Sequence, residues 1–269
     1  MTISEAVLLG FVQGFTEFLP ISSSGHLVLF RSLFGIDIQF ALAFDAILHL
    51  ATVLAIIIYF YDDLWFLSQT ALRKLGRLPV NRKEEILMYA LVVGTLPAAT
   101  VGFFAEPYMT TYFNSPLLVA IFLFFASLFF MYGEWRYYTE PRHGSLTVNT
   151  GFRIGLFQMM ALLPGFSRSG ATIVGGMLLG LNRYEATKFA FLLAIPITLG
   201  VGLKKFLDWL VSDEVILWVP VLVSAVVSFF VALLCIHYFL KFIRRYTLWP
   251  FVWYTLIISI FILFVYLFA

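Results

Sequence analysis

The sequence predicts an all-α polytopic membrane protein. Of its 269 residues, 62% are hydrophobic and only 12% are charged, and the mean hydropathy of +0.97 excludes a water-soluble globule. Several apolar runs reach the ~20 residues that a helix needs to cross a bilayer. Two other apolar regions are broken in the middle by proline and serine, a pattern typical of re-entrant hairpins. We expect six transmembrane helices plus two re-entrant helical hairpins in a single membrane domain, residues 1–269.

The first hairpin is predicted from residues 4–19 and 25–35, with Pro20 and three serines between them. At ~1.5 Å per residue neither piece is long enough to span ~30 Å of hydrocarbon. The amino terminus lacks the basic region and cleavage site of a signal peptide, so the first helix is expected to stay in the mature protein.

The crossings are expected at 41–60, 86–105, 116–132, 185–206, 215–238 and 248–268. The polar segment 61–83 is predicted to be a loop with an interfacial helix, and 134–149 a second polar loop. Pro97 is expected to kink the second crossing.

The second hairpin repeats the form of the first at an offset of 145 residues. It is predicted from residues 151–163 and 168–181, and Gln158 takes the place of Gln13. Because three crossings, an odd number, separate the hairpins, the second hairpin should enter the membrane from the opposite face. The sequence therefore predicts an inverted-topology repeat, with repeat one at about 1–133 and repeat two at about 150–269.

Lysine and arginine predict the orientation. The face with loops 61–83, 134–149 and 239–247 carries ten of them, against three on the other face. Since basic loops stay in the cytoplasm, we expect a multi-pass protein of the plasma (inner) membrane with both termini extracytoplasmic. The basic residues form no stripe of the kind that binds nucleic acid, so no nucleic-acid partner is expected.

Glu17 is the first candidate for chemistry. Gln13 and Glu17 are spaced i, i+4, so on a helix they could present two oxygen ligands to one cation. A carboxylate at membrane depth is costly and usually lines a functional cavity. The alternative is that Glu17 pairs with an arginine to hold helices together.

Ser22, Ser23 and Ser24 begin the second half of the first hairpin. Serines cap helices, and the free N–H groups of a helix amino terminus attract anions. Ser22 and Ser23 precede His26 by four and three residues, so a hydroxyl and the imidazole could interact. A simple capping cluster with a polar histidine beside it is the alternative.

Arg168, between Ser167 and Ser169 in the second hairpin, favours the functional interpretation. A permanently charged guanidinium matches the oxygens of phosphate. A phosphate close to Glu17 would be repelled unless a divalent cation bridges them, and Mg²⁺ fits that need. The combination predicts metal-assisted phosphoryl chemistry on a lipid-borne phosphate.

Other polar residues are interpreted more simply. Asp45 and His49 could supply a partner to the site or a second cation ligand, or form a pair within their own helix. We expect Glu134 and His237 to lie at the membrane interface, and Tyr254 to be an interfacial anchor.

The two motifs together resemble a known family. Residues 13–26, Gln-Gly-Phe-Thr-Glu-Phe-Leu-Pro-Ile-Ser-Ser-Ser-Gly-His, and residues 164–172, Pro-Gly-Phe-Ser-Arg-Ser-Gly-Ala-Thr, resemble those of the undecaprenyl-pyrophosphate phosphatase family of the bacitracin-resistance type. The resemblance extends over nearly the whole chain and implies hydrolysis of polyprenyl pyrophosphate to the monophosphate, dependent on a divalent cation, in recycling the lipid carrier of cell-wall synthesis. Mg²⁺ is the expected cation, with Ca²⁺ as the alternative, and a homodimer stays open.

The resemblance also implies roles for single residues. Expected catalytic residues are Glu17, Ser23, His26 and Arg168; expected substrate-binding residues are Gln13, Ser22, Ser24, Ser167, Arg168, Ser169 and Thr172; expected metal ligands are Glu17 and Gln13. Many members have glutamate at the position of Gln13, and a neutral amide there should weaken the hold on the metal. Either Ser23 attacks phosphorus with His26 as base, or His26 attacks or activates a water.

Two rival functions are weighed. Inverted repeats with broken helices also occur in transporters, so a polyprenyl-phosphate flippase is the first rival. The second rival is the other class of integral lipid phosphatase. That class needs an Arg-Pro dipeptide, which this chain lacks, and a histidine six residues after its Ser-Arg arginine, where this chain has Val174. The sequence therefore argues against this class.

Overall fold

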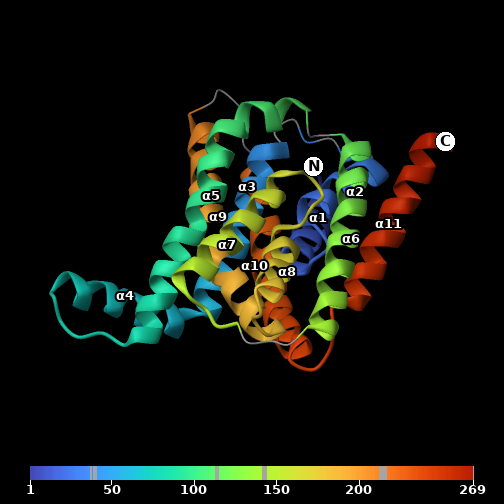
Figure 1. Ribbon diagram of the computed structural model, residues 1–269. Coiled ribbons are helices and arrows are strands. Elements are labelled where there is room, and N and C mark those ends of the chain that lie inside the picture. The colour runs from blue at the N-terminus through green and yellow to red at the C-terminus, as the bar shows by residue number, and fades with distance from the viewer. Residues whose placement is uncertain (37, 39–40, 113–114, 141–143, 212–216, 269) are drawn as a thin grey trace.

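The computed structural model describes residues 1–269 apart from 37, 39–40, 113–114, 141–143, 212–216 and 269, and the side chains of 42 and 106–112 are also left undescribed. Across the described residues the protein is helical and contains no strand (Figure 1). The elements are α1 (Ile3–Thr16), α2 (Ser23–Phe34), α3 (Ala41–Tyr59), α4 (Tyr61–Leu75), α5 (Arg82–Tyr112), α6 (Pro116–Thr139), α7 (Val148–Gln158), the 3₁₀ helix η1 (Met159–Leu162), α8 (Arg168–Leu178), α9 (Arg183–Leu210), α10 (Trp218–Ile243) and α11 (Trp249–Phe268).

Helix length and hydropathy confirm the prediction of a polytopic membrane protein. Among the described residues, α5, α6, α9, α10 and α11 are each long and apolar enough to cross a bilayer. α3 and α4 meet at 79° and make a sixth span when they are counted together. α4 has two aspartates in its first turn and a lysine and an arginine in its last, and it projects away from the bundle (Figure 1).

Several helices extend beyond their expected ends. α6 continues to Thr139 and α10 to Ile243, because the polar residues that end an apolar run can stay helical outside the hydrocarbon. The polar loop expected at 134–149 therefore begins only after α6 ends. α5 continues as one helix through Pro97.

Two helix pairs are interrupted, as expected from the proline and serine breaks. The break between α1 and α2 covers residues 17–22, and the break before α8 follows η1. Ser22 and Ser167, at the ends of the breaks, have φ values of 71° and 66°, a region that non-glycine residues rarely occupy. Each serine hydroxyl accepts a hydrogen bond from the N–H three residues on, at 3.3 and 3.2 Å. Both half-helices thus begin with the same cap.

Small residues bring the first half of each pair against a long helix. α1 packs on α10, and α7 packs on α5. A Cβ added to Gly10 would lie 2.4 Å from the carbonyl oxygen of Ser224, and one added to Gly155 would lie 2.2 Å from that of Gly94. Small residues commonly allow such close contact between helices in membranes. The packing of α1 on α10 and of α7 on α5 holds both breaks inside the bundle.

The two breaks meet each other in the interior. The hydroxyl of Ser169 donates to the carbonyl oxygen of Leu19 at 2.9 Å, so the start of α8 is fastened to the chain that follows α1. The amino terminus and the end of α11 lie at one end of the bundle, while α4 lies at the other (Figure 1).

Candidate active site

Glu17 and Arg168 form the centre of the candidate site. Glu17 follows α1 directly, and its side chain is only 3% exposed. Arg168, the first residue of α8 and 21% exposed, donates a hydrogen bond to Oε1 of Glu17 and another to the hydroxyl of Thr198 on α9. The structure therefore brings the acid of the first motif and the guanidinium of the second motif together. Their direct contact is the alternative that the sequence left open, in which Glu17 pairs with an arginine.

The second oxygen of Glu17 has three polar neighbours. Oε2 accepts hydrogen bonds from the hydroxyl of Ser23 at 2.6 Å and from Nε2 of Gln13 at 2.9 Å. Nδ1 of His49 lies 3.1 Å from the same oxygen and 2.9 Å from Nε2 of Gln13. Oε1 of Gln13 is buried and has no hydrogen-bond partner. The cluster thus joins α1, α2, α3 and α8 around one carboxylate.

His26 faces away from this cluster. Its Nδ1 lies 2.7 Å from the carbonyl oxygen of Ser22, and its Nε2 lies 2.7 Å from the hydroxyl of Tyr254 on α11. Because a carbonyl only accepts, Nδ1 carries the proton and Nε2 of the neutral ring accepts from Tyr254. The expected bond between a serine hydroxyl and the imidazole is absent here, since the hydroxyl of Ser23 donates to Glu17 instead.

The remaining predicted hydroxyls mainly hold the backbone. Ser22 and Ser167 cap α2 and α8, and Ser169 fastens the two breaks together. The hydroxyl of Thr172 donates to the carbonyl oxygens of its own helix at 2.8 and 3.2 Å, while Ser24 is exposed. The roles of these hydroxyls in substrate binding stay predictions. The caps place the first residue of α2, Ser23, and the first residue of α8, Arg168, beside Glu17.

Asp45 and His49 have different partners. They do not pair within α3: Asp45 binds Arg31 through two hydrogen bonds of 2.8 Å, whereas His49 reaches Glu17, which fits the alternative that His49 supplies a partner to the site. Glu134, expected at the membrane interface, is fully buried within the protein and accepts from Arg183 at 3.0 and 2.5 Å.

Thr198 and Tyr254 are contacts that the sequence did not reveal as part of the site. Both lie in long apolar helices outside the two motifs. The hydroxyl of Thr198 also donates to its own helix, as is common for threonine in membrane helices, and the sequence favours an interfacial anchor for Tyr254, so neither residue pointed to the site.

The oxygens at the site fit a cation that substrate would help to hold. Among the described residues no group of three histidine, cysteine or acidic side chains is placed to bind a metal. Glu17 and the unpartnered Oε1 of Gln13 nevertheless offer two oxygens, and Mg²⁺ is commonly held by one or two protein carboxylates together with phosphate oxygens and water. The residues present therefore fit Mg²⁺ bound together with a phosphate, not a complete protein cage.

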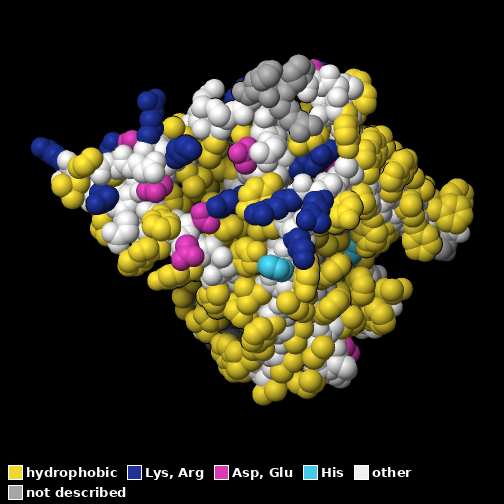
Figure 2. Space-filling model, turned by 90° about the horizontal axis from the view of Figure 1, so that it is seen from below, with side chains coloured by type: hydrophobic (Ala, Val, Ile, Leu, Met, Phe, Trp, Pro, Cys, Tyr) yellow, Lys and Arg dark blue, Asp and Glu magenta, His cyan; other side chains and the backbone are white. Residues whose placement is uncertain are grey.

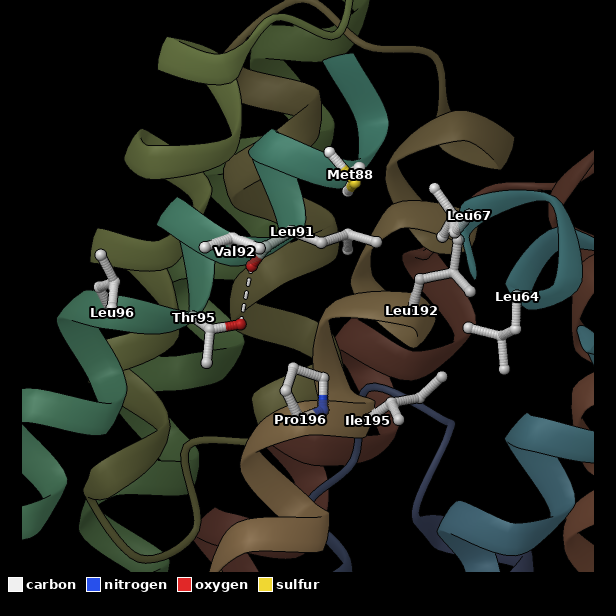
Figure 3. A pocket seen from close by; sticks show the side chains of 10 residues that line it. All are labelled: Leu64, Leu67, Met88, Leu91, Val92, Thr95, Leu96, Leu192, Ile195 and Pro196. Atoms are coloured by element: carbon white, nitrogen blue, oxygen red, sulfur yellow. Dashed lines mark hydrogen bonds between the residues drawn. The ribbon is translucent and has the colours of Figure 1, made fainter. Parts of the chain in front are cut away.

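An apolar cleft outside the site has no side chain that could take part in catalysis. It has a volume of about 430 Å³ and lies between α4, α5 and α9, among residues such as Leu64, Met88 and Pro196 (Figure 3). The single hydroxyl drawn there belongs to Thr95 and donates to the carbonyl oxygen of Leu91 at 2.7 Å. The cleft offers an apolar surface only.

Fold and site together define an integral membrane protein in which two interrupted helix pairs assemble a buried cluster of a carboxylate, a serine hydroxyl and a guanidinium. The sequence model of one family, described as bacitracin resistance protein BacA, matches residues 6–261. The chain belongs to this family, which confirms the resemblance seen in its two motifs.

Curated relatives agree. A protein of Trichlorobacter lovleyi is 41% identical over 258 residues, covering 94% of this chain and 93% of its own length. A protein of Alteromonas mediterranea is 38% identical over 256 residues, covering 95% and 96%. Both are named undecaprenyl-diphosphatase.

Proposed function

We propose that this protein is an undecaprenyl-diphosphatase, which hydrolyses polyprenyl pyrophosphate to the monophosphate and inorganic phosphate. In this role it would recycle the lipid carrier for cell-wall synthesis and confer resistance to bacitracin. The observation that carries the proposal is the contact of Glu17 with Arg168 across the two breaks, because the guanidinium suits a diphosphate headgroup and the acid beside it suits the cation that would offset the repulsion between acid and phosphate. The names of the relatives favour hydrolysis over the flippase alternative.

The membrane topology that we propose has six crossings, made by α3, α5, α6, α9, α10 and α11, and two re-entrant hairpins. An inverted repeat at the 145-residue offset is supported by Ser22 and Ser167, which share a positive φ and a cap, and by Gly10 and Gly155, which make equivalent close contacts. The basic loops would lie in the cytoplasm and both termini outside, in the plasma membrane.

Arg168 would change partner when substrate binds. At rest its guanidinium neutralises Glu17, so the buried carboxylate is not left unpaired. A diphosphate offers more negative charge and a better geometric match to the guanidinium fork. Arg168 and the amino termini of α2 and α8 would hold the phosphates, leaving Oε1 of Glu17 and Oε1 of Gln13 free to hold Mg²⁺, which would neutralise charge on the phosphate oxygens, while Oε2 of Glu17 stays with Ser23.

Ser23 is the nucleophile that the geometry favours. Its hydroxyl already donates to Oε2 of Glu17 at 2.6 Å. As the serine oxygen bonds to the terminal phosphorus, its proton passes to the carboxylate, and the bridging P–O bond breaks to release the polyprenyl monophosphate. Water then hydrolyses the phosphoserine and releases inorganic phosphate. His26 is the alternative nucleophile, and its Nε2 would first have to part from Tyr254.

The test uses purified protein in detergent with undecaprenyl pyrophosphate and Mg²⁺. We expect release of inorganic phosphate that is lost in Arg168→Ala. Transport of the intact lipid without phosphate release would support the flippase instead. Brief reaction with labelled substrate followed by acid separates the nucleophiles, since phosphoserine survives acid and phosphohistidine does not; recovery of neither would favour direct attack by water.

A further inference from the structure

A polar hollow lies at the end of the bundle opposite the termini. This hollow, which we call the arginine pocket, has a volume of about 360 Å³ and is bordered by Arg183, Tyr184, Arg244, Arg245 and Tyr246. These residues come from the start of α9 and from the turn that follows α10. Lysine and arginine side chains gather on this face of the molecule (Figure 2).

The arginine pocket carries an excess of positive charge. Arg183 is neutralised by the buried Glu134, whereas neither Arg244 nor Arg245 has an ion-pair partner within the part of the chain that the structure describes. Both are exposed. Two uncompensated guanidiniums beside a third that is already paired make a site for an anion.

The walls of the pocket are held in place. The guanidinium of Arg183 lies 3.7 Å from the ring centroid of Tyr137, and that of Arg244 lies 4.2 Å from that of Tyr184. Such stacking fixes the plane of a guanidinium. Arg183 uses its edge donors on Glu134, so the donors that can bind an anion are those of Arg244 and Arg245. Glu134 also accepts from the N–H of Leu248 at 2.6 Å, which ties the turn before α11 to α6. Arg183 and Arg244 are therefore held in place before an anion binds.

We propose that the arginine pocket binds the phosphate group of an anionic membrane lipid. The pocket lies where spanning helices end, which is the depth of lipid headgroups, and basic pockets between helices at this depth suit them. Tyr246, which is 60% exposed, supplies the aromatic rim common at that interface. Arg183 and Thr198 are 15 residues apart on α9, about 22 Å along the helix axis, so the pocket is separate from Arg168. The proposal does not depend on phosphatase activity.

The test measures how lipids shift the melting temperature of purified protein in a neutral detergent. Phosphatidylglycerol is the probe, phosphatidylcholine is its uncharged control, and sodium phosphate tests a free anion. The variant R244Q/R245Q removes the unpaired charge. R73Q/R77Q removes the same charge from exposed arginines on and just after α4, outside the pocket.

We expect phosphatidylglycerol to stabilise the parent protein and R73Q/R77Q alike, with about tenfold weaker apparent affinity in R244Q/R245Q. R245Q alone keeps Arg244 stacked on Tyr184 and should lose part of the affinity, so misfolding cannot account for the loss. Equal weakening in both double variants would overturn the proposal, because the attraction would then belong to the whole basic face. Equal stabilisation by phosphatidylcholine or by sodium phosphate would overturn it as well.

Discussion

Glu17→Gln tests whether the central ion pair does more than hold helices together. Glutamine preserves the shape of the side chain and removes its charge, so the guanidinium of Arg168 loses its ion-pair partner and keeps only neutral oxygens, such as the hydroxyl of Thr198, as hydrogen-bond partners. Breaking a buried ion pair by removing one partner typically costs about 3–5 kcal/mol. Since Arg168 is 21% exposed and water can partly solvate it, we expect about 2–3 kcal/mol, or roughly 5–10 °C in melting temperature.

Phosphate release should fall much further than stability. Glu17 accepts the proton of Ser23 in the proposed mechanism, so we expect a loss of at least about 100-fold at a temperature where the variant is folded. The assay is release of inorganic phosphate from undecaprenyl pyrophosphate in detergent, with melting temperature measured on the same sample.

The double variant E17Q/R168Q decides between the two roles. It leaves no unpaired charge, so a large part of the lost stability should return, while phosphate release should stay absent. If release returned with stability, the pair would be only a structural brace and the proposed mechanism would be refuted.

Asp45→Asn is the matched control. Asp45 and Arg31 also form a partly buried ion pair, with side chains 16% and 12% exposed. This variant should lose stability to a similar extent and keep phosphate release when folded. An equal loss of release in this control would mean that any broken ion pair inactivates the protein.

Three further outcomes are expected. EDTA should abolish phosphate release and excess Mg²⁺ should restore it; release that is unchanged in EDTA would remove the metal from the reaction. Ser23→Ala should cut release by at least about 100-fold and shift the melting temperature by only a few degrees, whereas full activity would point to His26 or water as the nucleophile. Gly10→Ala should cost about 1–3 kcal/mol, seen as a lower melting temperature, because its Cβ would lie 2.4 Å from the carbonyl oxygen of Ser224; Gly200→Ala, with open space around its Cβ, should not destabilise the protein.

The two motifs that contain proline and serine predicted which residues form the centre of the site. Serines beside prolines predicted the breaks, and the cost of a buried charge left two roles open for Glu17, a place in a functional cavity or a pair with an arginine. Arg168 was the matching group in the second motif, and it is bonded to Glu17 across 151 positions of sequence. Short polar motifs in an apolar chain are readable in this way because each buried polar group requires a specific partner.

Side-chain pairing between distant helices could not be predicted in the same way. Spacing placed Ser23 within reach of His26, but its hydroxyl donates to Glu17, a contact that depends on how α1 and α2 meet. The partner of His26 is Tyr254, which is 228 positions away on α11. The place of Glu134 at the end of an apolar run did not reveal its partners, which are Arg183 and the N–H of Leu248 in the turn before α11.

The resting arrangement explains why a divalent cation should be required although the protein lacks a complete cage for one among its described residues. With Arg168 on Glu17, the site is close to neutral and can persist at membrane depth. A diphosphate that takes Arg168 leaves the carboxylate beside several phosphate charges, and this repulsion must be offset. A cation that enters together with the substrate offsets it, so metal affinity should be weak in the free protein and strong in the complex. Tight Mg²⁺ binding to the free protein, measured by calorimetry, would contradict this coupling.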